Sequence, residues 1–288
     1  MFDFTPQHAW LVGIDSDGCA FDTMELKQKE CFTPNTINFY GLQGVSKYAR
    51  EACDFVHLYS KSRGINRFPA LVEELEWTAR RPEVRARGIQ VRVPPALKDW
   101  VRHEPKLGNP ALAEAVRRSD DADLEHALEW SQAVNRAVED MVHGVPPFPF
   151  VRECLEKLAG RADILVVSAT PQEALQREWA EHDLAKYVVA ILGQESGTKR
   201  EFLGTAGNYP PEHALMIGDA PGDYKAAVAN KALYFPINPG AEEASWRRLF
   251  EEGIERFLSG EFAGRYQEDL LAEFERYLPE RPPWPVVE

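Results

Sequence analysis

The chain has 288 residues, enough for one large or two moderate domains, and a formal net charge of −13 at neutral pH. This acidic balance argues against a general nucleic-acid partner. No stretch is long and apolar enough to span a bilayer, and the N-terminus has no basic segment followed by an apolar one. The cysteines lack the spacing of metal ligands or of a disulfide framework, so we expect free thiols in a cytoplasmic protein with no membrane partner.

The first apolar run, Trp10-Leu11-Val12-Gly13-Ile14, ends in the fragment Asp15-Ser16-Asp17-Gly18. A continuous apolar run bounded by a turn predicts a buried, parallel strand, here near residues 10–15. Loops that leave the carboxyl ends of such strands are where α/β folds place their chemistry. Two carboxylates one residue apart are therefore candidate catalytic groups, although Asp and Gly are also ordinary turn residues.

The pattern of residues 23–145 predicts a helical insertion after the first strand and its turn. The clearest helix is expected over 120–143, where apolar residues recur at helical spacing. The following run, Gly144-Val145-Pro146-Pro147-Phe148-Pro149, is typical of a boundary. We therefore expect a discontinuous core made of 1–22 and 146–238, a helical domain over 23–145, and a helical C-terminal extension over 239–288.

The later part of the chain alternates between strands and helices, which predicts an α/β fold with a Rossmann-like parallel sheet. Strands are expected near 164–168, 187–192, 214–218 and 232–237, and helices near 149–160, 171–182, 198–206 and 221–230.

Three of these strands end in polar fragments. Ser168 follows the second strand, Lys199 follows the third, and Gly218-Asp219-Ala220-Pro221-Gly222-Asp223 follows the fourth. In the fragment after Ser168, we expect Thr170 to cap a helix with Pro171 at its first position. The amino end of that helix would be an anion site.

In this order, the fragments resemble the haloacid dehalogenase-like (HAD) hydrolases, in their phosphatase and phosphomutase branch. That family's pattern is an Asp-x-Asp turn, a Ser or Thr after the second strand, a Lys, and Gly-Asp-x-x-x-Asp after the fourth strand. The resemblance covers residues 8–22 and 146–238, and the insertion at 23–145 resembles the family's helical cap. It implies a Mg²⁺-dependent phosphatase that hydrolyses a small organic phosphomonoester through an aspartyl-phosphate.

The carboxylates have distinct expected roles. Asp15 would attack phosphorus, and Asp17 would protonate the leaving oxygen and then activate water. Asp15, Asp219 and the backbone carbonyl of Asp17 would supply the hard oxygen ligands that Mg²⁺ prefers, with Asp223 supporting the metal site.

Other residues would bind the substrate. Ser168, Ala169 and Lys199 would hold the transferred phosphoryl group, although Ser168 could equally be a turn hydroxyl and Lys199 a surface lysine. Residues 61–106 carry eleven Lys or Arg against six Asp or Glu, mostly expected on a solvated surface. Within that stretch Gly64 interrupts a helical pattern, so Arg63, Asn66 and Arg67 are expected to converge on a second anionic group of the substrate.

Several alternatives remain at this stage. A phosphomutase of the β-phosphoglucomutase type and a non-catalytic phosphate-binding protein share the same residues. A haloacid dehalogenase or a phosphonate hydrolase is disfavoured, because those branches lack the second Asp. The residue spacing excludes an EF-hand and a P-loop, and the histidines show no close pairing that would suggest zinc.

Overall fold

The computed structural model describes residues 5–287, which form two compact units. The first unit comprises the N-terminal segment up to Met24 and residues His143–Leu278. The second comprises Glu25–Val142 and the C-terminal segment from Pro279. The short helix α1 (Thr23–Leu26) carries the chain from the first unit into the second.

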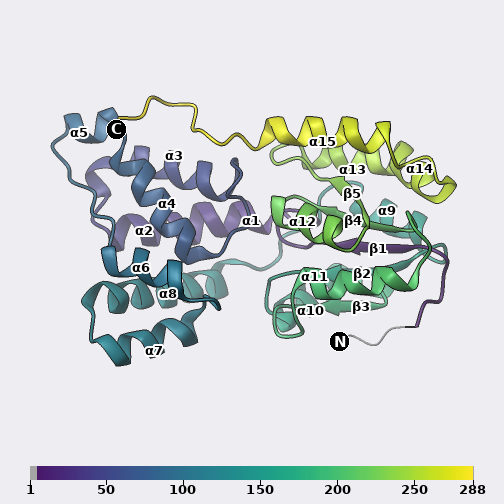
Figure 1. Ribbon diagram of the computed structural model, residues 1–288, viewed down its shortest axis with the longest axis horizontal. Helices are drawn as coiled ribbons and strands as arrows, with labels where there is room; N and C mark the ends of the chain where they lie inside the picture. The colour runs from purple at the N-terminus through teal and green to yellow at the C-terminus, as the bar shows by residue number, and fades with distance from the viewer. Residues whose placement is uncertain (1–4, 288) are drawn as a thin grey trace. The chain divides into compact units, whose positions relative to one another are not determined.

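The first unit is built on a parallel sheet that has five strands among the described residues, in the order β3-β2-β1-β4-β5 (Figure 1). The strands are β1 (Leu11–Ile14), β2 (Asp163–Val167), β3 (Ala190–Leu192), β4 (Ala214–Gly218) and β5 (Leu233–Pro236). The predicted α/β class with a Rossmann-like parallel sheet is confirmed. β3 is shorter than expected because the residues before it, Ala185–Tyr187, form a 3₁₀ turn.

The strand order places a switch point beside β1. The chain runs outward from β1 to β2 and β3, then returns to β4 on the other side of β1. In open α/β sheets, ligands bind at the carboxyl ends of the strands where the order reverses in this way. The ends of β1 and β4 are therefore the expected position of an active site.

Helices cover both faces of the sheet. Alternate strand residues point to opposite faces, so each strand contributes to two hydrophobic cores. Val12, Ile14 and Ile217 pack on one face with residues of α9, α10, α13 and α14, and Leu11 and Met216 pack on the other with residues of α11, α12 and α15. These helices are α9 (Val151–Leu158), α10 (Gln172–Glu181), α11 (Lys199–Phe202), α12 (Pro221–Ala229), α13 (Glu242–Arg248), α14 (Ile254–Ser259) and α15 (Arg265–Tyr277).

The second unit is helical, with its own core around Phe68, Leu75 and Trp130. Its elements are a π-helical turn (Lys27–Phe32), α2 (Thr33–Phe39), a 3₁₀ turn (Gln43–Val45), α3 (Ser46–His57), α4 (Arg67–Ala79), α5 (Pro82–Ala86), α6 (Pro95–His103), α7 (Asn109–Ser119) and α8 (Ala122–Met141). The helix expected over 120–143 is α8, whose N-cap is Asp121.

The C-terminal segment packs on the second unit. The Trp284 ring lies edge-on to Phe55, the Arg81 guanidinium lies over the Trp284 ring, and the backbone N–H of Val287 donates to Arg80 O. Along residues 5–287, no helix combines the length and apolar character that a bilayer crossing requires.

Candidate active site

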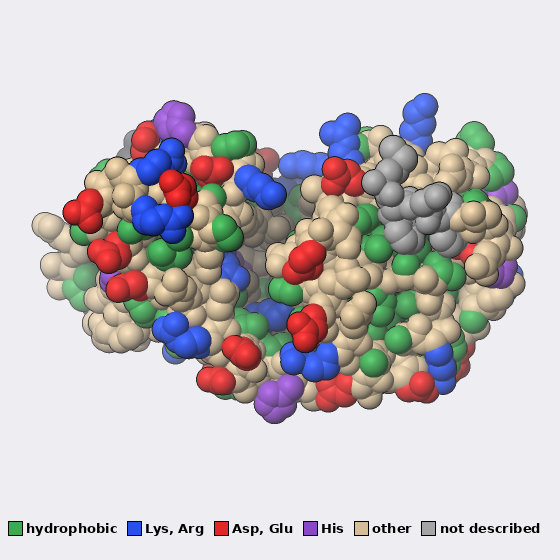
Figure 2. All heavy atoms as spheres, turned by 90° about the horizontal axis from the view of Figure 1, so that it is seen from below, with side chains coloured by type: hydrophobic (Ala, Val, Ile, Leu, Met, Phe, Trp, Pro, Cys, Tyr) green, Lys and Arg blue, Asp and Glu red, His purple; other side chains and the backbone are tan. Residues whose placement is uncertain are grey.

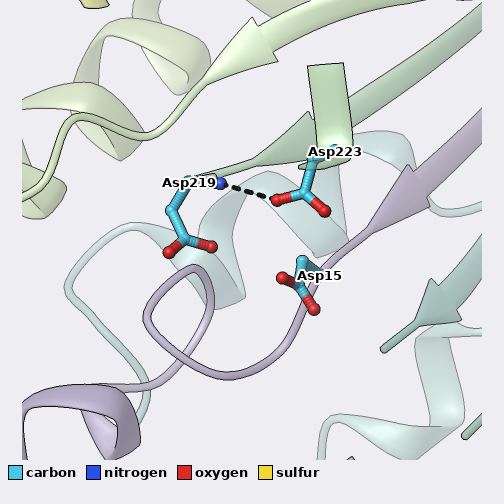
Figure 3. Close-up of side chains that lie close together, drawn as sticks. All are labelled: Asp15, Asp219 and Asp223. Atoms are coloured by element: carbon cyan, nitrogen blue, oxygen red, sulfur yellow. Dashed lines mark hydrogen bonds between the residues drawn. The ribbon is translucent and has the colours of Figure 1, made fainter. Parts of the chain in front are cut away.

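Three carboxylates meet at the switch point of the sheet. Asp15 directly follows β1, Asp219 directly follows β4, and Asp223 lies in the first turn of α12 (Figure 3). β1 and β4 pair in register, and the backbone N–H of Asp15 donates to Ile217 O at 3.0 Å. One carboxylate oxygen from each of the three residues lies within 4.8 Å of the others, and all three side chains are buried. Among the described residues, this group alone has the composition and spacing to hold a metal ion.

Asp223 is fixed by the turn that precedes α12. Its Oδ2 accepts hydrogen bonds from the backbone N–H groups of Asp219 (3.2 Å) and Ala220 (3.1 Å). The carboxylate reaches these donors by passing directly over Gly218, where an added Cβ would lie 2.5 Å from the Asp223 Cβ. Glycine at position 218 is therefore required by close packing, and its φ angle is not in the left-handed region.

Lys199 supplies the positive charge of the cluster. It is the first residue of α11, whose N-cap is Thr198, and Thr198 and Glu201 form a capping box. Its Nζ lies 2.5 Å from Asp15 Oδ2 and 2.5 Å from Asp223 Oδ1. Burial alone would lower the pKa of Lys199, but the charges of Asp15 and Asp223 outweigh it and raise the pKa above its ordinary value. Lys199 is therefore charged, and it bridges the two carboxylates.

One lysine does not neutralise three carboxylates. Burial raises the pKa of Asp15 to about 8, because desolvation and the charges of Asp223 and Asp219 together exceed the lowering effect of Lys199. The cluster thus has an excess of negative charge in a desolvated place. A donor set of buried carboxylate oxygens with this excess fits a hard divalent cation such as Mg²⁺.

Asp17 lies apart from the three-carboxylate group and is held by two hydroxyls. Thr23 Oγ1 donates to Asp17 Oδ1, and Thr170 Oγ1 donates to Asp17 Oδ2, both at 2.6 Å. Thr170 is therefore not the predicted N-cap: Pro171 takes that position, and α10 begins at Gln172. The hydroxyl expected to cap the helix binds Asp17 instead, and the Gln172 N–H donates to the carboxylate of Glu195.

Ser168 directly follows β2, the neighbour of β1, and is buried. Its backbone N–H donates to Leu192 O, and its Oγ accepts a long hydrogen bond (3.3 Å) from Thr170 N–H. The next residue, Ala169, is exposed. Parallel pairing thus places Ser168 at the same edge of the sheet as Asp15. The Ser168 hydroxyl accepts from a backbone N–H two residues further along, which is a contact typical of a turn residue.

Cys19 is fully buried in the turn after the Asp-x-Asp fragment. Its Sγ lies 3.7 Å from Ile217 O. Burial, and to a smaller extent the charges of the nearby carboxylates, raises the pKa of the thiol well above its ordinary value. A thiol in this environment is protonated and inert.

The structure adds site residues that the sequence patterns did not reveal. Thr23 and Thr170 bind Asp17, the Tyr234 hydroxyl donates to Gly218 O at 2.8 Å, and Trp246 Nε1 donates to Cys19 O at 2.7 Å. The sequence carried no signal for Tyr234 or Trp246, because each is a large residue whose polar atom has a partner remote along the chain. The Thr170 hydroxyl, two residues after Ser168, is more commonly explained as a helix cap.

Arg63, Asn66 and Arg67 all lie in the helical unit, where they bind its own backbone and side chains. The buried Arg63 guanidinium donates to Leu58 O, and Asn66 caps α4 by accepting from Phe68 N–H. Arg67 donates to residues of α8: to the Ser131 hydroxyl (3.0 Å), to the Ser131 carbonyl (3.3 Å) and to the Asn135 side chain (2.6 Å).

These contacts lie within the helical unit, and convergence of the three side chains on a second anionic group of the substrate stays a prediction. Desolvation lowers the pKa of Arg67 to about 10, so it stays protonated at neutral pH and retains its packing contacts with α8. In the surrounding basic stretch, Arg81 binds Glu51, Arg92 binds Asp123 and Lys98 binds Glu76. On the face shown in Figure 2, acidic and basic side chains are interspersed.

No protein-family model and no curated protein matches the chain. Similar solved structures include a predicted phosphoglycolate phosphatase from Haemophilus somnus, with 14% identity over 81% of this chain and 86% of that chain and a TM-score of 0.49. A proposed phosphoglycolate phosphatase from Lactobacillus delbrueckii subsp. bulgaricus has 15% identity over 90% and 100% of the two chains, with a TM-score of 0.48. A proposed β-phosphoglucomutase from Bacteroides vulgatus has 14% identity over 90% and 93%, with a TM-score of 0.45.

Proposed function

We propose that the protein is a Mg²⁺-dependent phosphatase that hydrolyses a small organic phosphomonoester through a phosphoryl group carried on Asp15. The observation that supports this most strongly is the buried group formed by Asp15, Asp219 and Asp223 with the bridging Lys199. Phosphoryl transfer requires a positioned nucleophile and concentrated positive charge around the transferred oxygens. This group offers a carboxylate nucleophile, a lysine and a cation site at one sheet edge.

The metal and the lysine have separate tasks in this proposal. Asp15, Asp219 and Asp223, with the backbone carbonyl of Asp17, would hold Mg²⁺, whose charge would keep Asp15 ionised and offset repulsion from the incoming phosphate. Without such a charge the raised pKa of Asp15 would leave it largely protonated at neutral pH. Lys199 would orient the Asp15 carboxylate and hold a phosphoryl oxygen, and Ser168 and Ala169 would bind the remaining oxygens.

The chemical steps use Asp15 and Asp17. An oxygen of Asp15 forms a bond to phosphorus as the ester P–O bond breaks, and the leaving oxygen takes a proton from Asp17. Asp17 then accepts a proton from water, whose oxygen attacks phosphorus and releases inorganic phosphate from Asp15. Thr23 and Thr170 would orient Asp17 for both transfers, since each donates to one of its two oxygens.

A panel of phosphomonoesters tests the proposal. Purified protein is incubated with each ester, with Mg²⁺ and with EDTA, and released phosphate is measured alongside the Asp15→Asn variant. We expect Mg²⁺-dependent release by the native protein and none by the variant. Equal release by both would remove Asp15 as nucleophile. Transfer of the phosphoryl group to a second hydroxyl of a sugar phosphate, in place of release, would establish the phosphomutase alternative.

A further inference from the structure

We infer that Ser16, the residue between the two site aspartates, is a positioning residue that fixes the Asp-x-Asp turn to helix α10 through Trp179 and Glu178. The inference rests on the proposed function, and it assigns a task to a hydroxyl that has no part in the chemical steps. Ser16 and Trp179 are fully buried. The Ser16 hydroxyl accepts from Trp179 Nε1 at 3.0 Å and donates to Glu178 Oε2 at 2.9 Å.

The Ser16 hydroxyl is the donor in one of these two hydrogen bonds and the acceptor in the other. A serine hydroxyl has a single proton to donate, and here it goes to the carboxylate of Glu178, while a lone pair receives the indole N–H. The direction of the Oγ is thereby defined from two sides. Both partners are consecutive residues of α10, and Trp179 is held in turn by an edge-on contact with Phe21, 5.7 Å between ring centroids.

The backbone of Ser16 transmits this constraint to the catalytic groups. Its N–H donates to Asp15 Oδ1 at 2.8 Å, which orients the proposed nucleophile. Its carbonyl accepts from the N–H groups of Cys19 (3.2 Å), Ala20 (2.9 Å) and Phe21 (3.1 Å), which closes the turn that presents Asp17. Rotation of residue 16 would therefore displace both aspartates together.

α10 also contacts the turn from its other end. The segment leading into the helix carries Thr170, whose hydroxyl binds Asp17. The turn is thus attached to the same helical segment at Thr170 and at Trp179, about two helical turns apart along the chain. Loss of the Ser16 contact would remove one of these two attachments and leave the turn held to the helical segment at Asp17 alone. A displacement on the order of 1 Å from reacting geometry costs about a hundredfold in rate.

The test compares Ser16→Ala with a matched change in the other unit. Ser131 is likewise fully buried, accepts from Arg67 at 3.0 Å and donates to Asn109 Oδ1 at 2.6 Å, so Ser131→Ala removes equivalent contacts far from the carboxylates in sequence. Thermal unfolding, kcat and KM are measured for both variants and the native protein, with one phosphomonoester that the native protein hydrolyses. Trp179→Phe is the second variant. It removes the indole donor and keeps an aromatic ring against Phe21, although the smaller ring also leaves space at a fully buried position.

We expect Ser16→Ala and Trp179→Phe to lower kcat by about ten- to a hundredfold while KM stays within about twofold. Ser131→Ala should lower the melting temperature and leave kcat within about twofold. The indole N–H resonance of Trp179, identified by its absence in Trp179→Phe, should move in Ser16→Ala and not in Ser131→Ala.

Two failures are distinguishable. If the native protein releases no phosphate, the proposed function fails, and the positioning role fails with it. If the native protein is active and Ser16→Ala keeps its kcat while only its melting temperature falls, the hydroxyl serves stability alone and the inference is overturned. Should Ser16→Ala not fold, Trp179→Phe decides the question on the same two criteria.

Discussion

The two charged groups that the sequence indicated differ in how their charges are balanced. At the sheet edge, three buried carboxylates share one lysine, and burial with like charges raises the pKa of Asp15 to about 8. In the helical unit, Arg63, Asn66 and Arg67 bind carbonyl, hydroxyl and amide groups of their own unit. An excess of like charge in a desolvated place costs stability and marks a functional site, whereas satisfied polar groups are typical of packing.

The largest effect expected from this contrast is at Asp15. Asp15→Asn replaces a nucleophilic carboxylate by an amide of similar shape and removes one charge from an overcharged cluster. We expect turnover to fall by more than about a thousandfold, as for other catalytic nucleophiles. The melting temperature of the metal-free protein should change little at neutral pH, where native Asp15 is largely protonated, and should exceed the native value above about pH 8, where the substitution relieves repulsion among ionised carboxylates. Retained Mg²⁺-dependent turnover would contradict the assignment.

Asp17→Asn should produce the next largest effect. The backbone carbonyl of residue 17 remains, but the proton-transfer group is lost, a role worth about a hundredfold to ten-thousandfold. Mg²⁺ affinity, measured by calorimetry, should survive in this variant and fall sharply in Asp219→Ala. The reverse pattern would mean that the metal-binding and proton-transfer roles are exchanged.

Gly218→Ala tests whether the cluster depends on close backbone approach. The new Cβ would lie 2.5 Å from the Asp223 Cβ, so the Asp223 carboxylate must move away from the N–H groups that hold it. We expect weaker Mg²⁺ binding and a stability loss of about 1–3 kcal/mol. Gly222→Ala, where an added Cβ meets nothing within 4 Å, is the control and should have a much smaller effect. Similar losses in both variants would show that packing over Gly218 is not the cause.

The pH dependence of stability offers a probe of the charge excess. The pKa of Asp15 is raised in the folded protein, from an ordinary value of 3.8 to about 8. Its stabilising contribution in the metal-free protein is therefore fully present below about pH 4 and is lost as the pH rises towards 8. Lys199 does not alter this window, because its raised pKa lies above it.

Mg²⁺ binding competes with the proton on Asp15, so the increase in melting temperature on adding Mg²⁺ should be larger at pH 8 than at pH 6. In Asp15→Asn this pH dependence should be largely absent. An increase of the same size at both pH values in the native protein would show that Asp15 is already ionised without the metal.

The smallest effect on catalysis is expected in the helical unit. Arg67→Met keeps much of the apolar stem but removes the donors to Ser131 and Asn135. We expect a stability loss of about 1–3 kcal/mol by denaturant unfolding, and kcat/KM within about twofold of the native value. A selective rise in KM for substrates with a second anionic group would instead support the role first expected for this segment.

The sequence is sufficient to predict those features that depend on neighbouring residues in the chain. Buried apolar runs predicted the strands of the sheet, and because parallel strands end at one edge, the residues after them were expected to meet. Asp15, Asp219 and Asp223 do so. The partners of Asp17 were not foreseeable, because a threonine at position 170 satisfies the rules of helix capping equally well.

The prediction that Arg63, Asn66 and Arg67 bind a second anionic group of the substrate stays a prediction. Arginine and asparagine beside a helix-interrupting glycine suit an anion site and also suit the packing of buried turns. For Arg67, the partners seen in the structure belong to α8, which begins more than fifty residues further along the chain. Helix α15 went unrecognised as a separate element, although its apolar residues Leu270 and Phe274 recur at helical spacing.

The most direct test of the account is capture of the phosphoryl group on Asp15. The native protein is mixed with Mg²⁺ and a hydrolysed phosphomonoester, quenched within one turnover, digested and analysed by mass spectrometry. We predict that the peptide containing Asp15 gains the mass of one phosphoryl group, and that the corresponding peptide of Asp15→Asn gains none. Turnover by the native protein without any phosphorylated Asp15 peptide would contradict this assignment, since phosphate would then be released without a covalent intermediate on this residue.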